Sequence, residues 1–193
     1  DRYKHKRSNH YNQEPMGHKY SRDEILDGAL QTALAEGLSR MTFGRLARRL
    51  GVSDRVIVYY FPSKTELIVA ILTDLAAQLQ AVLADAFAEP AAGHRELVRA
   101  AWPVLATEEV DPIFGLYFEA IGQATAGVEP FAGLAGQLIE GWIGWLTGFF
   151  TGDPESCRAE ATATLALLDG LLLMRQLAGG AAADRAATQL GLR

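Results

Sequence analysis

The sequence is poor in cysteine and histidine. It contains one cysteine, Cys157, and four histidines among 193 residues. A single cysteine excludes an intramolecular disulfide framework and is typical of a reducing compartment, so we expect a cytoplasmic protein. His5, His10 and His18 lie within the first twenty residues, and only His94 lies further along, which is too few for a metal site with Cys157. We expect no metal and no cofactor.

The motifs of common enzyme classes are also missing. The chain contains no G-x-S-x-G nucleophile elbow, no P-loop, no H-E-x-x-H and no dinucleotide-binding glycine pattern. The most apolar stretch, residues 131–150, is interrupted by Gln137, Glu140 and several glycines, and no basic residue flanks it. No charged segment followed by an apolar run opens the chain, as a secretory signal would. We therefore expect neither an enzyme nor a membrane partner.

Charge is distributed unevenly along the chain. The formal net charge is −5, yet residues 1–66 contain 12 of the 18 Lys and Arg residues and 8 of the 23 Asp and Glu residues. Residues 67–193 contain the other 6 cations and 15 acids. This asymmetry predicts a small basic domain that binds a polyanion, joined to an acidic domain with a different task.

Helix signals follow one another from Ser21 onward, and no alternating strand pattern or fixed repeat occurs. The segment S-R-D-E at 21–24 is a capping box, and an apolar stripe follows it. A second capping box, S-K-T-E at 63–66, opens a long helix. We predict an all-α fold with helices between Ser21 and Gly37, between Thr42 and Gly51, and at 54–60, 64–88, 93–106, 112–126, 130–150 and 155–178, followed by a weakly ordered tail from Gly179.

The second and third predicted helices have the spacing of a helix-turn-helix. Gly51 supplies the left-handed turn, and Pro62 ends a helix short enough to enter a major groove. Arg55 can donate to guanine, valines can contact a thymine methyl group, and tyrosine hydroxyls can reach phosphates. The alternative is a helical corner with solvated charges, but the segregated charge and the crowded aromatics favour DNA binding. The candidate DNA-binding residues are Thr42, Arg45, Arg48, Ser53, Asp54, Arg55, Val56, Val58, Tyr59, Tyr60 and Lys64.

Residues 41–72, M-T-F-G-R-L-A-R-R-L-G-V-S-D-R-V-I-V-Y-Y-F-P-S-K-T-E-L-I-V-A-I-L, resemble the signature of the TetR family of bacterial repressors. The shared features are a Thr before the second helix, L-A-R-R-L-G-V-S, an aromatic pair with Phe after it, and a Lys three residues later. The strong resemblance covers about residues 22–70, and beyond it only the helical layout and L-A-L-L-D-G-L-L-L at 165–173 are similar. Val58 stands where the family usually has Tyr, and Tyr60 where it often has His, so the family's base preference does not carry over.

The resemblance implies a homodimer with a ligand cavity in the body of each subunit. The helices at 131–150 and 155–178 would pack with those of a second copy as a four-helix bundle. A stripe formed by Gly141, Gly144 and Gly148 suits the close approach of another helix. Aromatic stripes at helical spacing are more often plain core than ligand contacts, but the resemblance favours a cavity with aromatic walls. The candidate ligand-binding residues are Trp102, Phe114, Tyr117, Phe118, Ile121, Trp142, Trp145 and Phe149.

Three acidic residues of the second half, Asp169, Glu119 and Glu140, are candidates for specific contacts. Asp169 lies within an apolar stretch, and an unpaired buried charge is costly, so we expect it to have a partner. An interface hydrogen bond or a helix cap is favoured over ligand contact, and Arg175 lies off its face. Glu119 and Glu140 leave room for a cationic group on a ligand.

Together these patterns predict a flexible basic arm at 1–20, a helix-turn-helix DNA-binding domain at 21–66, and a helical ligand-binding and dimerisation domain at 67–193. The helix at 64–88 is the only link expected between the two domains. The arm either follows the minor groove or is a disordered or vector-derived tail. The second alternative arises because the chain does not begin with Met, whereas Met16 could be the product of a start codon.

The predicted function is a homodimeric, ligand-responsive transcriptional repressor. It would bind a palindromic operator in double-stranded DNA and be released by a small, largely hydrophobic effector. The alternative is a small-molecule-binding helical protein whose basic module docks a protein partner.

Overall fold

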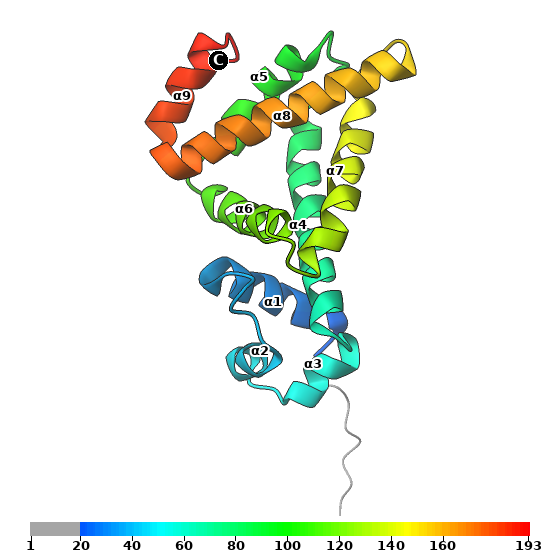
Figure 1. Ribbon diagram of the computed structural model, residues 1–193, viewed down its shortest axis with the longest axis vertical. Coiled ribbons are helices and arrows are strands. Elements are labelled where there is room, and N and C mark those ends of the chain that lie inside the picture. The colour runs from blue at the N-terminus through cyan, green and yellow to red at the C-terminus, as the bar shows by residue number, and fades with distance from the viewer. Residues whose placement is uncertain (1–19) are drawn as a thin grey trace, which may run out of the picture.

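The computed structural model of the protein describes residues 20–193. The arm predicted at residues 1–20 lies outside the described residues, except for Tyr20. Residues 20–193 form nine α-helices and no strand, which confirms the all-α prediction (Figure 1). Along the chain the helices are α1 (Arg22–Glu36), α2 (Phe43–Leu50), α3 (Asp54–Tyr60), α4 (Lys64–Ala86), α5 (His94–Leu105), α6 (Asp111–Thr125), α7 (Phe131–Thr147), α8 (Pro154–Ala178) and α9 (Gly180–Gln189).

The first four helices begin and end where local sequence signals place them. The Ser21 hydroxyl accepts a hydrogen bond from the Glu24 amide at 3.2 Å, and the Glu24 carboxylate accepts one from the Ser21 amide at 2.6 Å. Thr42 and Ser63 each accept a hydrogen bond from the amide of the third residue of the helix that follows them. Gly51 ends α2 in the left-handed conformation, with φ of 67°, which glycine adopts without strain.

Buried side chains form two hydrophobic clusters, and α4 belongs to both. In the head (residues 20–66), Ile25, Leu46 and Ile57 pack with the first half of α4. In the body (residues 67–193), a second cluster surrounds the later part of α4 from Leu79 onward. One uninterrupted helix therefore runs out of the head and through the body (Figure 1). The domain boundary between residues 66 and 67 stays a prediction.

Two helices, α4 and α8, are long and apolar enough to cross a membrane. The core helices of globular proteins pass the same test, so two such helices are weak evidence for a membrane span. Leu67 and Leu79 of α4 and Leu168 and Leu172 of α8 belong to the hydrophobic clusters. We therefore assign α4 and α8 as core helices.

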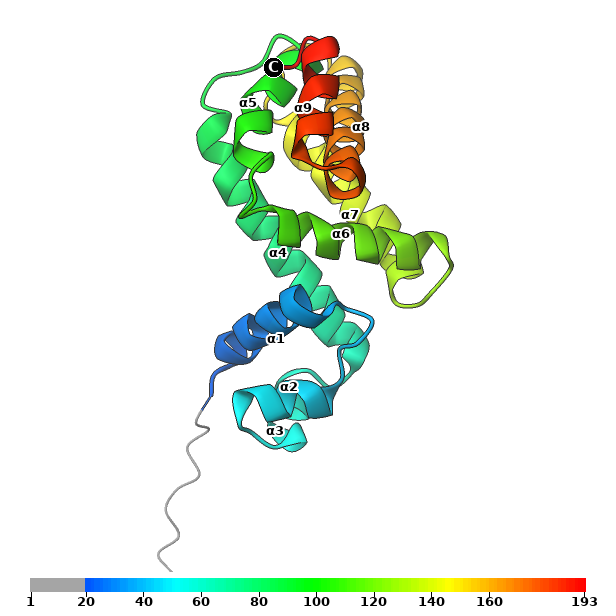
Figure 2. The same cartoon turned by 90° about the vertical axis from the view of Figure 1, so that its left-hand side faces the viewer.

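A second contact joins head and body in addition to α4. The Glu119 carboxylate of α6 accepts hydrogen bonds from the amides of Leu38 and Ser39, both at 2.9 Å, and from the Ser39 hydroxyl at 2.5 Å. Burial raises the pKa of Glu119, but these hydrogen bonds outweigh burial and hold the pKa below its usual value. Figure 2 shows α6 crossing the molecule next to α1. The expectation that the helix at 64–88 is the only link is therefore wrong.

The loop at this second contact depends on a glycine. Gly37 has φ of 86°, a region that other residues rarely adopt. A Cβ atom at this position would lie 2.9 Å from Oε2 of Glu119. Glycine therefore lets the carboxylate approach the loop backbone closely.

The C-terminal segment is helical rather than weakly ordered, so that expectation is wrong. Helix α9 packs on α8 and buries Ala183 and Ala187. The Trp102 indole donates to the Asp184 carboxylate at 3.1 Å. Two arginines of α5 donate to the carbonyl oxygens that follow α9, both at 2.8 Å. Because small alanines bury little apolar area, these long-range polar contacts supply what the local sequence pattern lacks.

Candidate nucleic-acid interface and internal cavity

Helix α3 presents one exposed face at the end of the head. Arg55 is exposed, and so are Val58 at 43% and Tyr59 at 64% of their surface. Ile57 is fully buried in the head cluster, and it fixes which side of the helix turns outward. An exposed face with a cation, an apolar side chain and an aromatic ring suits contact with base edges and backbone.

Two of the predicted DNA-binding residues of α3 lie partly inside the head. Val56 and Tyr60 are partly buried against the head cluster. The Tyr60 hydroxyl donates to the carbonyl oxygen of Tyr20 at 2.7 Å, and the Tyr20 hydroxyl donates to the carbonyl oxygen of Leu50 at 3.0 Å. These two bonds tie the start of α1 to the ends of α2 and α3, and so hold the helix-turn-helix together.

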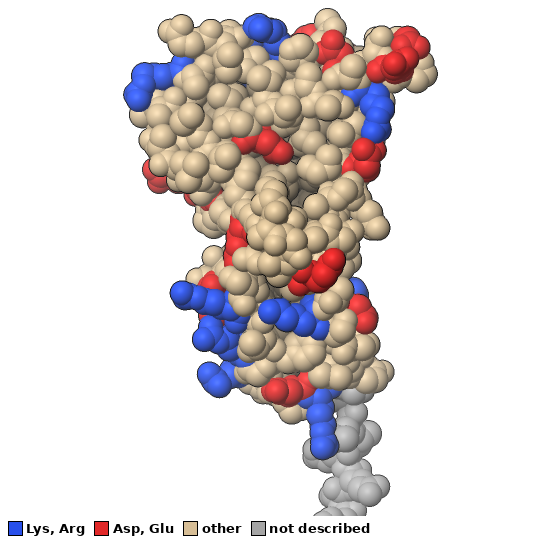
Figure 3. Space-filling view, in the orientation of Figure 1, with Lys and Arg blue, Asp and Glu red and all other residues tan. Residues whose placement is uncertain are grey.

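Basic residues flank the exposed face of α3. Lys and Arg side chains gather over the head in the space-filling view, on the face that it shows (Figure 3). Arg45 and Arg49 of α2 lie 3.1 Å and 3.8 Å from the two carboxylate oxygens of Glu36. Arg48, Asp54 and Lys64 are exposed nearby along the sequence. The Ser53 hydroxyl makes no capping hydrogen bond to α3, whereas the Thr42 hydroxyl caps α2.

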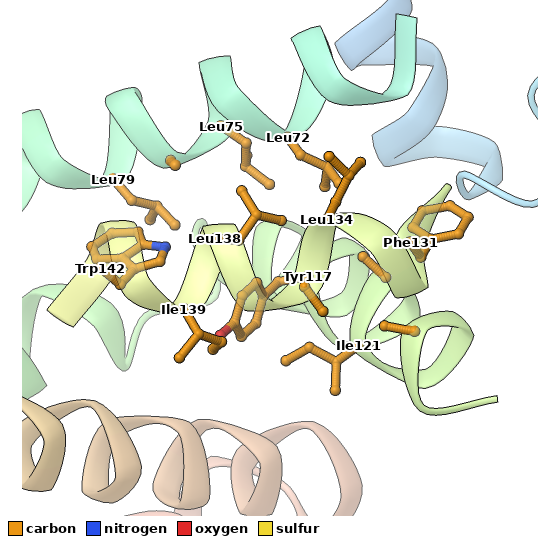
Figure 4. Close-up of a pocket in the computed structure, with 14 residues that line it drawn as sticks. Leu72, Leu75, Leu79, Tyr117, Ile121, Phe131, Leu134, Leu138, Ile139 and Trp142 are labelled. Carbon is orange, nitrogen blue, oxygen red and sulfur yellow. The ribbon is translucent and has the colours of Figure 1, made fainter. Parts of the chain in front are cut away.

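The body contains two adjoining apolar cavities. The first, of about 60 Å³, lies between α4, α6 and α7 (Figure 4). The second, of about 40 Å³, is bounded by α4, α5, α6, α7 and α8. Leu79, Tyr117 and Trp142 line both cavities, so the two spaces meet at these side chains. The remaining lining residues of the first cavity are Leu72, Leu75, Ala76, Ala120, Ile121, Ala124, Phe131, Leu134, Ala135, Leu138 and Ile139.

One carboxylate lines the second cavity. Asp169 of α8 accepts a hydrogen bond from the Tyr117 hydroxyl at 3.1 Å. Burial raises the pKa of Asp169 to about 6, although the Tyr117 bond partly opposes this. Burial also raises the pKa of Tyr117, so the phenol stays protonated. No other charged side chain of residues 20–193 lines either cavity.

Other acidic residues of the body are engaged elsewhere. Arg175 forms a bidentate pair with Asp111, at 2.5 Å and 2.9 Å, and does not contact Asp169. Glu140 pairs with Arg158 at 2.6 Å on the surface. Glu119 binds the head loop. Neither Glu119 nor Glu140, the two glutamates suggested for a cationic ligand group, therefore lines either of these two cavities.

The structure brings four of the eight candidate ligand-binding residues to the cavities. Phe114, Tyr117, Ile121 and Trp142 line one cavity or both. The other four lie elsewhere: Trp102 faces α9, Phe118 packs on its neighbours in α6, and Trp145 and Phe149 pack on Phe87.

Sequence reasoning missed the leucine wall of α4 and the role of Asp169 in the cavity lining. The leucines at 72, 75, 79 and 83 recur at helical spacing, and this stripe was a usable signal.

Helices α7 and α8 each keep an uncovered face. A Cβ atom added at Gly141 or Gly144 of α7 would meet no other atom within 4 Å. On α8, Leu173, Met174 and Leu177 expose 41%, 45% and 79% of their surfaces. Large apolar side chains exposed together on one helix are typical of an interface.

Known proteins are similar to the head in sequence and to most of the chain in fold. Residues 25–71 match the model of the bacterial regulatory proteins of the tetR family. No curated protein matches the sequence. A transcriptional regulator from Rhodococcus sp. Rha1 is 22% identical with a TM-score of 0.64, over 81% of this chain and 84% of its own. The TetR transcriptional regulator from Legionella pneumophila is 24% identical with a TM-score of 0.56, over 83% and 89%. The multidrug binding protein EbrR, complexed with proflavin, is 23% identical with a TM-score of 0.61, over 88% and 98%.

The matched region extends from α1 into α4 and contains the entire helix-turn-helix. Proteins with this domain are DNA-binding regulators and not enzymes. The solved structures extend the similarity of fold over the body. Residues 25–71 therefore form a DNA-binding domain of the tetR family of bacterial regulatory proteins, and the chain shares its fold with solved transcriptional regulators.

Proposed function

We propose that the protein is a homodimeric, cytoplasmic repressor that binds a palindromic operator in double-stranded DNA. It releases the operator when a small, largely hydrophobic effector enters the cavities of the body. The observation that carries this proposal is the course of α4. This helix begins at the exposed Lys64 in the head, and it lines the first cavity with Leu72, Leu75 and Leu79.

DNA recognition falls to the exposed face of α3. Arg55 donates to a base edge, and Val58 and Tyr59 contact a thymine methyl group or the backbone. The partly buried Tyr60 positions α3 through its bond to the Tyr20 carbonyl group. The exposure of this short helix at the end of the head supports this orientation, because the second helix of a helix-turn-helix lies in the major groove.

Phosphate contact requires two arginines of α2 to exchange partners. Arg45 and Arg49 both lie next to Glu36 in the free protein. Exposed ion pairs of this kind contribute only about 0–1 kcal/mol, so a DNA phosphate replaces Glu36 at little loss. Thr42, Arg48 and Lys64 complete the backbone contacts, since all three are exposed.

Effector binding is coupled to the head through two helices. The existing cavities, at about 60 Å³ and 40 Å³, are far smaller than the roughly 300–1,000 Å³ of a usual ligand site. An effector therefore has to push α4, α6 or α7 outward. Helix α4 continues into the head, and α6 holds the head loop through Glu119, so movement of either helix shifts α3.

Dimer geometry turns this shift into loss of affinity. Two half-sites lie at a fixed spacing along the duplex, so displaced heads no longer bind both. The exposed apolar side chains of α8 and the open glycine face of α7 support a subunit interface formed by these helices. EbrR, a multidrug binding protein solved in complex with proflavin, shares this fold, which supports the binding of a small-molecule effector.

Selection of binding sites from a randomised duplex library, followed by mobility shift at two salt concentrations, tests the proposal. We expect an inverted repeat to be selected, and affinity to fall steeply with salt because several phosphates are neutralised. Failure to select any sequence, together with capture of a protein by the head, would support the protein-docking alternative.

A further inference from the structure

We propose that the effector is a monocation with an apolar tail, whose cationic group lies against Asp169 in the second cavity and whose tail fills the first. This inference rests on the proposed function for its regulatory meaning, although the binding site itself is defined by the cavities alone. The cation is recognised by the carboxylate of Asp169 and by the rings of Phe114, Tyr117 and Trp142, which line the same cavity.

The partners of Asp169 leave its charge without compensation. Its Oδ2 accepts the Tyr117 hydroxyl, and Oδ1 accepts no hydrogen bond from residues 20–193. No Lys, Arg or His of these residues forms an ion pair with it, because the nearest arginine along α8, Arg175, is engaged by Asp111. A carboxylate in an apolar cavity is costly until it is paired with a cation.

The chemistry of the cavity excludes the other charge classes. An anionic ligand would add a second negative charge to a poorly solvated site, which is strongly unfavourable. A neutral ligand would bury the carboxylate more deeply without pairing it. A cation gains both the carboxylate and the negative faces of the aromatic rings, which attract cations. At neutral pH, Asp169 is mostly ionised because the pKa of its carboxyl is about 6.

The first cavity defines the rest of the ligand. Its lining contains Leu, Ile, Ala and Phe side chains together with Tyr117 and Trp142, and no charged residue. Tyr117 lines both cavities, and its hydroxyl points to Asp169 in the second, so the cation and the tail lie on opposite sides of this ring. In Figure 4, Leu72, Leu75 and Leu79 of α4 face the α7 side chains across the space that the tail would enter.

Calorimetric titration of the whole protein with four probes of equal chain length tests the inference. The probes are decylamine, decyltrimethylammonium, decanol and decanoate, all below their micelle concentrations. We expect both cations to bind more tightly than decanol, and decanoate to bind most weakly. Tighter binding of decylamine than of decyltrimethylammonium would indicate that the ammonium group also donates a hydrogen bond to Asp169. Equal binding of the two cations would indicate that the site recognises the positive charge through the carboxylate and the ring faces alone. Both results support a cation site.

Variants locate the cation. Asp169→Asn should weaken decylamine binding by about 30-fold or more, as removal of one member of a buried charge pair does, and should not weaken decanol binding, because the neutral probe no longer buries an unpaired charge. Glu140→Gln, which removes an exposed carboxylate outside the cavities, should leave all probes unchanged. The decanol affinity and the helical circular dichroism show whether Asp169→Asn remains folded. If it does not fold, the order of the four probes on the unaltered protein decides.

Three results would overturn the inference: decanoate or decanol binding as tightly as the cations, decylamine binding equally to Asp169→Asn, or none of the probes binding. Operator binding is measured on the same preparations. Intact operator binding with any of these results would reject the cationic effector and leave the repressor proposal standing. Absent operator binding with a confirmed cation site would reject the repressor and leave the site.

Discussion

The head and the body of this protein are both helical, but they are specified in different ways. In the head, short helices begin and end at polar caps, and the exposed surface is charged. In the body, long apolar helices enclose two small cavities, and the decisive polar contacts join residues far apart in the sequence. The Tyr117–Asp169 bond spans 52 residues, and the Trp102–Asp184 bond spans 82.

This difference corresponds to the two tasks of a regulator. A reading surface must keep one geometry, so local caps and the Tyr20–Tyr60 bond hold the head together. Under the proposed function the body must deform to admit an effector, and leucine side chains line the first of its two small cavities. Helix α4 and Glu119 connect the head to the body.

The largest expected effect comes from separating two copies of the body. Leu173→Glu places a charge on the exposed face of α8. If α8 forms the subunit interface, the protein should become monomeric, and operator affinity should fall on the order of a hundredfold or more because two linked heads act as one bivalent binder. Analytical ultracentrifugation and mobility shift measure the two quantities. A variant that stays dimeric would place the interface elsewhere.

A smaller effect is expected at the reading surface of the head. Arg55→Ala should reduce specific binding by about 1–3 kcal/mol and relax base preference, as loss of a bidentate contact to guanine does. Arg158→Ala, which removes an exposed arginine of the body, serves as the control. Competition titrations with operator and scrambled DNA measure the change. Unchanged specificity would mean that a different face of α3 reads the bases.

In the body, a stability effect should reveal the same carboxylate that we assign to effector binding. The pKa of Asp169 is raised from 3.8 to about 6, so the folded state binds this proton more tightly than the unfolded state. The free energy of unfolding therefore falls as pH rises from about 4 to about 6. Asp169→Asn lacks this loss and should be more stable than the unaltered protein by about 1–3 kcal/mol at pH 8.

Urea unfolding at pH 4 and pH 8 measures this difference. The stability advantage of Asp169→Asn should be present at pH 8 and absent at pH 4, where the carboxyl is protonated in both states. If Asp169→Asn and the unaltered protein differed in stability by the same amount at both pH values, Asp169 would be well solvated. That result would weaken the comparison between a polar head and an apolar cavity.

The smallest expected effect is a change in salt dependence. Lys64→Ala removes one exposed charge at the start of α4. Affinity for all DNA sequences should weaken alike, and the slope of log affinity against log salt should fall by about one unit. Thr65→Ala, at the next exposed position, should leave the slope unchanged. An unchanged slope for Lys64→Ala would show that α4 does not reach the backbone.

The sequence predicts most of the head because its signals are local. Ser21 with Glu24, Thr42, Gly51 and Ser63 lie within a few residues of the helix ends that they define. The sequence predicts less completely which side chains of α3 face outward, because the burial of Val56 and Tyr60 depends on packing against other helices. The matched family and the all-α fold follow from the same local signals.

The body is less predictable because its important contacts are tertiary. Trp102 belongs to an aromatic pattern, but its bond to Asp184 turns it toward α9 and away from the cavities. A carboxylate of α6 gives no local sign that it will reach the loop after α1, as Glu119 does. Helix α9 has little apolar surface, and its order follows from the α5 and α8 side chains that it meets.

The central claim is that the body controls the head, and a reciprocal titration tests it most directly. The affinity of decylamine is measured with and without saturating operator, and the affinity of operator with and without saturating decylamine. Linkage requires the two ratios to be equal, and the account predicts that each ligand weakens the other by about 5–150-fold, the usual range of such coupling. Equal decylamine affinity in the presence and absence of operator would show that an occupied cavity does not act on the head, and would contradict the account.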